Sequence, residues 1–132
     1  GSANGHFGNH TSPSDTANYT ALMAEFRNQL NAQGAADHTY YRLTAAVPSG
    51  GNDMAKIQVS SVAPYLDTVG IMSYDMHGAW EQGAGVKTNF QAPLYPSPND
   101  PDTTDHFTVD EAVQRWQGAG MPASKLLVGV PF

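Results

Sequence analysis

The sequence predicts an α/β fold in which parallel strands alternate with helices. Three short apolar runs, at 41–47, 68–74 and 126–130, have the near-continuous apolar character of strands that are buried on both faces. Helical patterns alternate with these runs, and strands in such an order pair in parallel through right-handed crossovers. Because three parallel strands make a poor independent sheet, we expect this sheet to be part of a larger α/β domain.

The first predicted element is a helix that follows a Gly- and Asn-rich loop at 1–11. Ser12 can cap this helix, Pro13 fits its first position, and Asp15 stands three residues after the cap. Gly34 is the predicted end of the helix. Apolar residues at helical spacing predict one buried stripe on it, made of Tyr19, Leu22, Met23, Phe26 and Leu30.

The remaining elements follow from turn and cap signals. A Pro-Ser-Gly-Gly turn closes the first strand, an interrupted helix is expected at 53–66, and a long Pro-rich irregular stretch fills 75–107. The last helix is predicted to begin at Thr108, where Glu111 completes a capping box, and to end at Gly120. The loops after parallel strands fall on one edge of the sheet, and that edge carries the site in folds of this kind.

The composition excludes several classes of function. With 12 acidic and 6 basic residues, a net charge of −6 and no Lys/Arg cluster, the chain is not expected to bind nucleic acid. No apolar run is long enough to span a bilayer, so no membrane partner is expected. The absence of cysteine excludes disulfides, thiolate zinc sites and cysteine nucleophiles.

The histidines do not predict a metal site. They show no ligand spacing, so we expect neither a metal nor another cofactor. His77 is instead expected to support the loop after the second strand. The five histidines are His6, His10, His38, His77 and His106.

The stretch GIMSYDMHGAW, at 70–80, carries the candidate functional residues. It begins as a buried strand and ends by presenting Tyr74, Asp75 and Trp80 at the functional edge. Met72 is expected to point the same way as Tyr74, because it lies two residues earlier on a strand. From the residues alone, Tyr74 could be a packed aromatic, Asp75 a turn acceptor, Met72 core filler and Trp80 a plug for the long loop.

Several blocks of the sequence, in this order, resemble glycoside hydrolase family 18, the chitinases. They are NYTALMAEFRNQL (18–30), LTAAVP (43–48), GIMSYDMHGAW (70–80), QAPLY (91–95), VDEAVQRW (109–116) and PASKLLVGVPF (122–132). The resemblance implies a partial (β/α)8 TIM barrel, about strands 5 to 7 with the intervening helices, since a full barrel needs about 250 residues. Residues 1–132 would run from the loop after strand 4 through strand 7 of a catalytic domain, and the NFQAPLY and SPNDP stretches resemble bacterial members.

The resemblance implies a chitinase that hydrolyses β-1,4 N-acetylglucosamine linkages with retention of configuration. The nucleophile in this family is the acetamido oxygen of the substrate itself, and the general acid is the Glu of a DxxDxDxE motif. That motif is absent from the chain, so we expect the chain to be inactive alone. A non-catalytic chitin-binding lectin of the same family, which keeps the cleft and replaces the acid, is the alternative.

The expected partners are chitin and N-acetylglucosamine oligosaccharides, and the parent protein is expected to be extracellular. Exposed strand edges would also allow copies of the fragment to associate with one another.

The resemblance assigns a role to each candidate residue. As the two catalytic residues, Tyr74 would hydrogen-bond the acetamido carbonyl, and Asp75 would contact the distorted sugar and help to keep the pKa of the acid raised. Both would also bind substrate, and Met72 would line the same subsite. Ala46 would leave room for the N-acetyl group, and Trp80 would stack on the apolar face of a pyranose.

Overall fold

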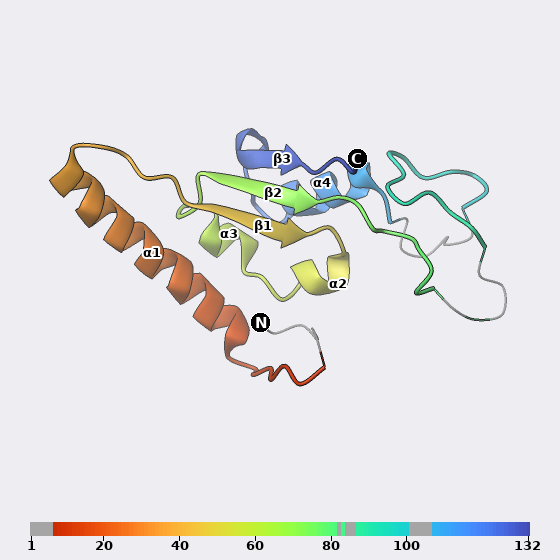
Figure 1. Ribbon diagram of the computed structural model, residues 1–132, viewed down its shortest axis with the longest axis horizontal. Helices are drawn as coiled ribbons and strands as arrows, with labels where there is room; N and C mark the ends of the chain where they lie inside the picture. Colours follow the sequence, from red (N-terminus) through yellow and green to blue (C-terminus); the bar gives the residue numbers. More distant parts are fainter. Residues whose placement is uncertain (1–6, 82, 84–86, 101–106) are drawn as a thin grey trace.

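The computed structural model describes residues 7–81, 83, 87–100 and 107–132, and the three strands form one sheet beside the helices (Figure 1). The elements are α1 (Asp15–Asp37), β1 (Thr44–Pro48), α2 (Gly51–Met54), α3 (Val59–Val62), β2 (Thr68–Met72), α4 (Val109–Gly118), the 3₁₀ helix η1 (Ala123–Lys125) and β3 (Leu126–Val128). Parts of the predicted loops at 1–11 and 75–107 lie outside the described residues, as do His6 and His106.

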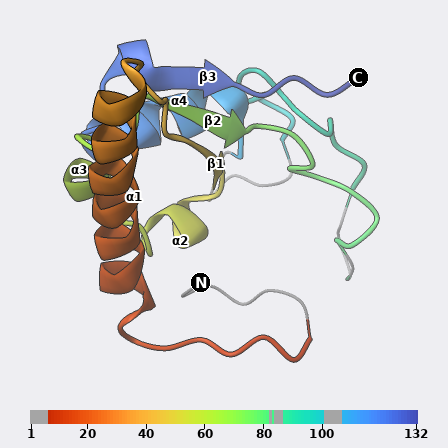
Figure 2. The same ribbon diagram turned by 60° about the vertical axis from the view of Figure 1, so that its left-hand side comes forward.

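The sheet is parallel and has the order β1-β2-β3, which confirms the predicted pairing. The carboxyl ends of the strands point the same way, and the long segment between β2 and α4 extends from that end (Figures 1 and 2). β1 and β3 form the two edges of the sheet. The fold therefore places the loops after the strands at one edge, as the sequence predicts.

One face of the sheet is covered and the other is open. Val47, Val69 and Ile71 are buried and pack with apolar side chains of α3 and α4 in the hydrophobic core. The next residues along the strands point the other way, because side chains alternate across a strand. On that face Ala46 pairs with Gly70, and Leu127 is exposed. An open apolar face is what part of a barrel presents in place of its packed interior.

α4 is fixed to the sheet by its largest side chain. Trp116 is fully buried, and its Nε1–H donates a hydrogen bond of 2.9 Å to the carbonyl oxygen of Pro48, at the end of β1. The predicted start of this helix is confirmed, because the hydroxyl of Thr108 accepts from the amide of Glu111 at 3.2 Å. The helix ends at Gly118, two residues before the Gly120 that the sequence predicts.

α1 begins later than predicted. Ser14, not Ser12, is at the N-cap, and the first helical residue is Asp15 instead of Pro13. Asp15 still meets Ser12, because its carboxylate accepts from the Ser12 amide at 2.9 Å. Ser12 and Asp15 therefore close a turn that precedes the helix.

α1 also ends later than predicted, because Gly34 is not its stop. Gly34 is a buried helical residue, and the helix continues to Asp37, where His38 takes a positive φ of 53°. A β-carbon on residue 34 would collide with the carbonyl oxygen of Thr39, since the chain folds back across the helix there. The glycine permits this close approach.

The predicted apolar stripe of α1 is only partly buried. Met23 is in the core and packs on the α3 side, whereas Leu22 and Phe26 are 48% and 45% exposed. α1 lies beside α3 (Figures 1 and 2) and reaches the core through this contact. The described part of the chain provides no partner surface for the outer half of the stripe.

The strands and the middle helix are shorter than predicted. β1 begins at Thr44 because the backbone of residues 41–43 is held by side chains, as described below. The expected helix at 53–66 is divided into α2 and α3. β2 ends at Met72 and β3 at Val128, before the predicted ends at residues 74 and 130.

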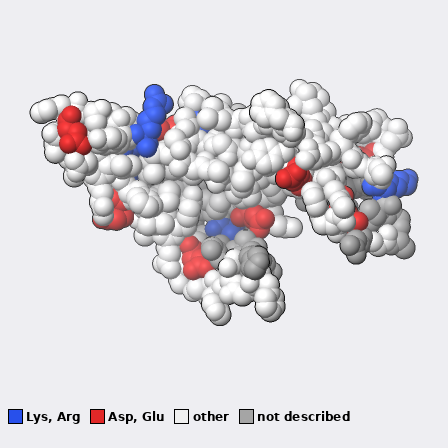
Figure 3. Space-filling model, in the orientation of Figure 1, with Lys and Arg blue, Asp and Glu red and all other residues white. Residues whose placement is uncertain are grey.

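Within the described ranges, no helix is long and apolar enough to cross a membrane. On the face seen in Figure 3, the Lys and Arg side chains lie apart from one another.

A buried arginine ties α1 to the amino ends of β1 and β2. The Arg27 guanidinium donates to Asp67 Oδ2 at 3.0 Å, to the Tyr40 hydroxyl at 2.9 Å and to the Tyr41 carbonyl at 2.6 Å. The same Asp67 oxygen accepts from the amide of Leu43 at 2.7 Å. These side chains satisfy backbone groups that a longer β1 would pair, which explains why the strand begins later.

Burial acts to raise the pKa of Asp67, but its hydrogen bonds from the Tyr40 hydroxyl and the Leu43 amide, together with the Arg27 charge, outweigh that effect. The pKa of Asp67 is therefore below its usual value. Because the unfolded chain binds this proton more readily, the carboxylate stabilises the fold above about pH 4. That contribution is lost as the pH falls through the lowered pKa.

We expect Asp67→Asn to lower the free energy of unfolding by about 2 kcal/mol at neutral pH, because it leaves Arg27 without its charged partner. The variant should also lose part of the decline in stability toward acid pH. Urea unfolding of both proteins at a series of pH values measures this. Asp110→Asn, which changes a carboxylate bonded to Gln114 on α4, is the control and should change stability much less. Parallel pH curves for the wild type and Asp67→Asn would contradict the assignment.

Candidate active site

A shallow pocket of about 280 Å³ lies at the carboxyl edge of β1 and β2. The register pairs Pro48 with Met72, so the ends of the two strands lie side by side. Side chains and backbone from both loops, with one residue from the segment before α4, line this pocket: Pro48, Ser49, Gly50, Asp53, Met72, Tyr74, Asp75 and Phe107. The pocket is therefore at the edge that the topology marks as functional.

The segment after β2 is hydrogen-bonded to the segment after β3. Ser73 is fully buried, and its hydroxyl donates to the carbonyl of Gly129 at 2.8 Å, while the Gly129 amide donates to the Ile71 carbonyl at 2.9 Å. A β-carbon on Gly129 would lie 2.7 Å from Cε1 of Tyr74, so the tyrosine ring rests on the Gly129 backbone. This contact sets the direction in which Tyr74 leaves the strand.

Asp75 is held by backbone conformation and by one side chain. Its φ is 52°, in the left-handed region that aspartate tolerates better than most residues. Its Oδ1 accepts from Nε2 of Gln91 at 2.6 Å, and the Gln91 carbonyl accepts from the amide of Met76 at 2.9 Å. Among the described residues, Asp75 Oδ2 has no hydrogen-bond partner, so one carboxylate oxygen is available to a ligand.

The pocket brings together three of the five predicted site residues. Met72, Tyr74 and Asp75 line it together, and Met72 and Tyr74 face the same cavity. Ala46 lies on the open sheet face, two residues before the end of β1, and does not line the pocket. Trp80 also lies outside the lining and is 61% exposed. The roles assigned to all five residues stay predictions.

Sequence reasoning missed three residues of this region. Asp53 and Phe107 line the pocket, and Gln91 orients Asp75. Asp53 lies two residues after the Pro-Ser-Gly-Gly turn that closes the first predicted strand, and this closeness to the functional edge was the available signal. Gln91 and Phe107 belong to a stretch without periodicity, and no local pattern indicates where they fold.

The pocket places hydrogen-bonding groups beside apolar surface. A phenol can donate, two carboxylates can accept, and a thioether and a phenyl ring offer apolar surface. Asp53 is only loosely paired with Lys56, at 3.9 Å. Within the described residues, no group of three or more His, Asp or Glu side chains could hold a metal ion.

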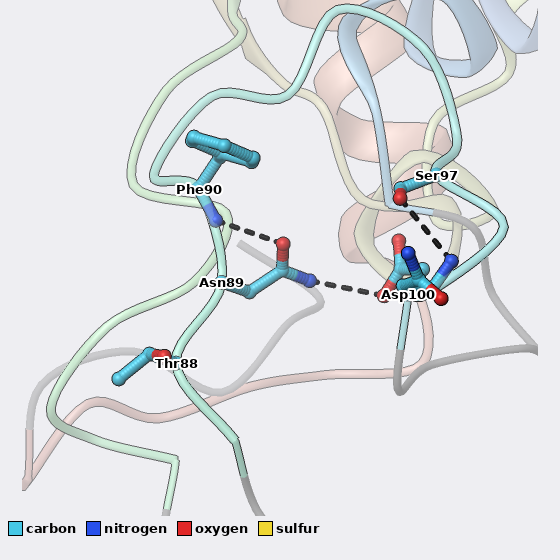
Figure 4. A pocket seen from close by; sticks show the side chains of 6 residues that line it. Thr88, Asn89, Phe90, Ser97 and Asp100 are labelled. Atoms are coloured by element: carbon cyan, nitrogen blue, oxygen red, sulfur yellow. Dashed lines mark hydrogen bonds between the residues drawn. The ribbon is translucent and has the colours of Figure 1, made fainter.

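A second hollow, of about 410 Å³, lies farther along the long loop, and a hydrogen bond joins two of its lining residues (Figure 4). Asn89 Nδ2 donates to Asp100 Oδ1 at 3.0 Å, and Asn89 Oδ1 accepts from the Phe90 amide at 2.8 Å. Asp100 is buried, and the Asp100 amide donates to the Ser97 carbonyl at 2.9 Å. These hydrogen bonds connect residues 89–90 with residues 97–100, so Asn89 and Asp100 have a structural role here.

Because of its backbone conformation, glycine and alanine should rank in opposite order of stability at Asp75 and at a helical position. At a φ of 52°, glycine is favoured over alanine, so we expect Asp75→Gly to be more stable than Asp75→Ala by about 1 kcal/mol. Asp53 lies in α2, where alanine is favoured, so Asp53→Gly should be less stable than Asp53→Ala. Urea unfolding of the four variants measures both differences. The same order at the two positions would show that Asp75 is not held in the left-handed region.

Comparison with known proteins agrees with this geometry. The family model for glycosyl hydrolases family 18 matches residues 4–132. Chitinase A1 of Niallia circulans is 35% identical over 127 residues, which cover 95% of this chain and 18% of that relative. The structure of chitinase ChiA74 from Bacillus thuringiensis superposes with a TM-score of 0.92 at 36% identity, over 99% of this chain and 20% of that one.

A third similar structure was solved with a bound oligosaccharide. A mutant of the Group II chitinase catalytic domain 2 of Ostrinia furnacalis, in complex with penta-N-acetylchitooctaose, has a TM-score of 0.78 at 32% identity. The match covers 92% of this chain and 29% of that one. The chain thus spans less than a third of the length of these relatives. The predicted α/β fold, part of a (β/α)8 barrel, is confirmed. The chain belongs to glycosyl hydrolases family 18.

Proposed function

We propose that the chain supplies the part of a chitinase active site that binds and orients an N-acetylglucosamine unit. The observation that carries this proposal is the meeting of Met72, Tyr74 and Asp75 in one pocket at the carboxyl edge of the sheet. In the intact protein, this half-site would serve hydrolysis of β-1,4 linkages in chitin with retention of configuration. The acetamido oxygen of the substrate would act as the nucleophile.

The two polar side chains have complementary parts in that reaction. The Tyr74 hydroxyl would donate to the acetamido oxygen and aim it at the anomeric carbon. As that oxygen bonds to the ring, positive charge develops on the acetamido nitrogen, and the free oxygen of Asp75 would accept its N–H. Gln91 keeps the Asp75 carboxylate in place by occupying the other oxygen. Met72 would contact the apolar side of the sugar.

The turnover step needs a proton donor for the leaving group. The chain has no DxxDxDxE motif, so we assign the general acid to a part of the parent protein outside these residues. Residues 1–132 would then correspond to the loop after strand 4 through strand 7 of the barrel. The substrate would be chitin or its oligosaccharides, as the ligand of the Ostrinia furnacalis relative suggests. Because chitin is an insoluble polymer, we place the parent protein outside the cell.

Two assays test the proposal. The isolated chain, incubated with penta-N-acetylchitopentaose, should release no shorter products in a chromatographic assay, because it lacks the acid. In the full-length parent, Tyr74→Phe should lower kcat by about 100-fold, with a smaller change in KM, because the lost donor acts mainly as charge develops. Tyr19→Phe, at a half-buried tyrosine of α1, is the matched control and should leave kcat unchanged.

Three results would contradict parts of the proposal. Hydrolysis by the isolated chain at the parent's rate would refute the assignment of the acid. An unchanged kcat in Tyr74→Phe would refute the role of the phenol. A parent protein that binds the oligosaccharide without cleaving it would be a chitin-binding lectin with the same pocket.

A further inference from the structure

The indole of Trp80 packs against the backbone of Gly78, which is called its seat. Its six-membered ring approaches the α-carbon of Gly78 so closely that a β-carbon on residue 78 would collide with it. The side chain is still 61% exposed, so the seat covers one part of the ring and leaves the rest open to a ligand. An exposed indole with such a seat is a flat apolar surface in a defined place.

Glu81 closes the turn that carries this ring. Its Oε1 lies 3.0 Å from Nδ1 of His77, and its Oε2 accepts from the amide of Gly78 at 3.3 Å. The Glu81 amide in turn donates to the Gly78 carbonyl at 3.1 Å. Glu81 therefore contacts both His77 and Gly78, and these two contacts form a bracket around the Gly78 backbone on which Trp80 packs.

His77 links the turn to the pocket. Its side chain is 5% exposed, and its ring packs edge-on to Phe107 with centroids 6.2 Å apart, while Phe107 lines the pocket with Tyr74 and Asp75. Nδ1 faces this carboxylate, and a neutral imidazole with its proton on Nδ1 would donate to it. The buried Nε2 has no hydrogen-bond partner in the described part of the chain. An unsatisfied buried nitrogen costs stability, so packing alone does not account for a histidine here.

We propose that His77 and Glu81 are positioning residues that hold Trp80 as a fixed platform at a set place relative to the pocket. The two contacts of Glu81 hold the turn, and the indole packs on the backbone of Gly78. The contact between His77 and Phe107 places the turn beside the pocket wall. Resting on the proposed function, this deepens it: His77 and Glu81 would keep in place the ring that the family resemblance assigns to stacking on a sugar. A ring that is already ordered loses less entropy when it binds.

Fluorine-19 NMR of the chain labelled with 5-fluorotryptophan tests the bracket without any sugar. The sequence has two tryptophans, and Trp80→Phe assigns their resonances. We expect Glu81→Leu to move the Trp80 resonance toward that of free 5-fluorotryptophan, with the buried Trp116 resonance unchanged as the sign of a folded core. Glu81→Gln should restore the wild-type resonance, because its amide can accept from Gly78 and donate to the other tautomer of His77.

Glu111 offers a matched control. Its pair with Arg115 has the same spacing and the same 3.0 Å separation, and the Glu side chains are 31% and 34% exposed at positions 111 and 81. Glu111→Leu should leave the Trp80 resonance in place. If Glu81→Leu also disturbs Trp116, then His77→Phe, which keeps a ring against Phe107, provides the same test. An unmoved Trp80 resonance in a folded variant of either kind would overturn the proposal.

A sugar titration separates this inference from the proposed function. Addition of penta-N-acetylchitopentaose to the wild-type chain should shift the Trp80 resonance, and the apparent Kd should rise several-fold in Glu81→Leu but not in Glu81→Gln. A bracket effect without any response to the sugar would uphold the positioning of Trp80 and refute the platform as part of a sugar site. A response to sugar that is equal in all variants would refute the positioning role alone.

Discussion

The hydrogen bond from Trp116 to the carbonyl of Pro48 is the interaction on which the functional edge depends. It joins the fully buried indole of α4 to the last residue of β1, where the parallel ladder ends. Since Pro48 is paired with Met72, fixing one strand end fixes the other. Both residues line the pocket, so its shape depends on this contact between the core and the strand end.

The two ends of the sheet differ in the partners of their charged side chains. At the amino end, the buried charge of Arg27 is matched by Asp67 and by backbone groups, and the result is stability. At the carboxyl end, Asp75 lines the pocket with a left-handed backbone, and Gln91 is the hydrogen-bond partner of its Oδ1. Unfavourable conformations of this kind persist where a ligand or a reaction requires them. The contrast agrees with the division between a stabilising and a functional face in (β/α)8 folds.

What the sequence could predict depended on whether the signal was local. The cap at Thr108 and the parallel strands were predicted correctly, because their signals lie within a few residues or within one run. Gly34 was misread as a helix end, since its real cause is the close approach of Thr39. The start of β1 was also wrong, because the Asp67 side chain, 24 residues from Leu43, takes the place of a strand partner.

The candidate site follows the same rule. Tyr74 and Asp75 could be found because they directly follow one apolar run, and Met72 because it lies two residues before Tyr74. Gln91 could not, since only the folded loop brings it to Asp75, 16 residues earlier. Ala46 was named through the family resemblance and Trp80 through its position after the strand, and neither lines the pocket. The bracket around Trp80 depends on a carboxylate whose purpose no sequence pattern indicates.

The most direct test of the account is a structure of this chain with a bound N-acetylglucosamine oligomer. The account predicts that one acetamido oxygen lies within hydrogen-bond distance of the Tyr74 hydroxyl, with Asp75 on the same sugar and Met72 beneath it. An oligomer that is bound elsewhere, for example in the hollow closed by Asn89 and Asp100, and that leaves Tyr74 untouched would contradict it.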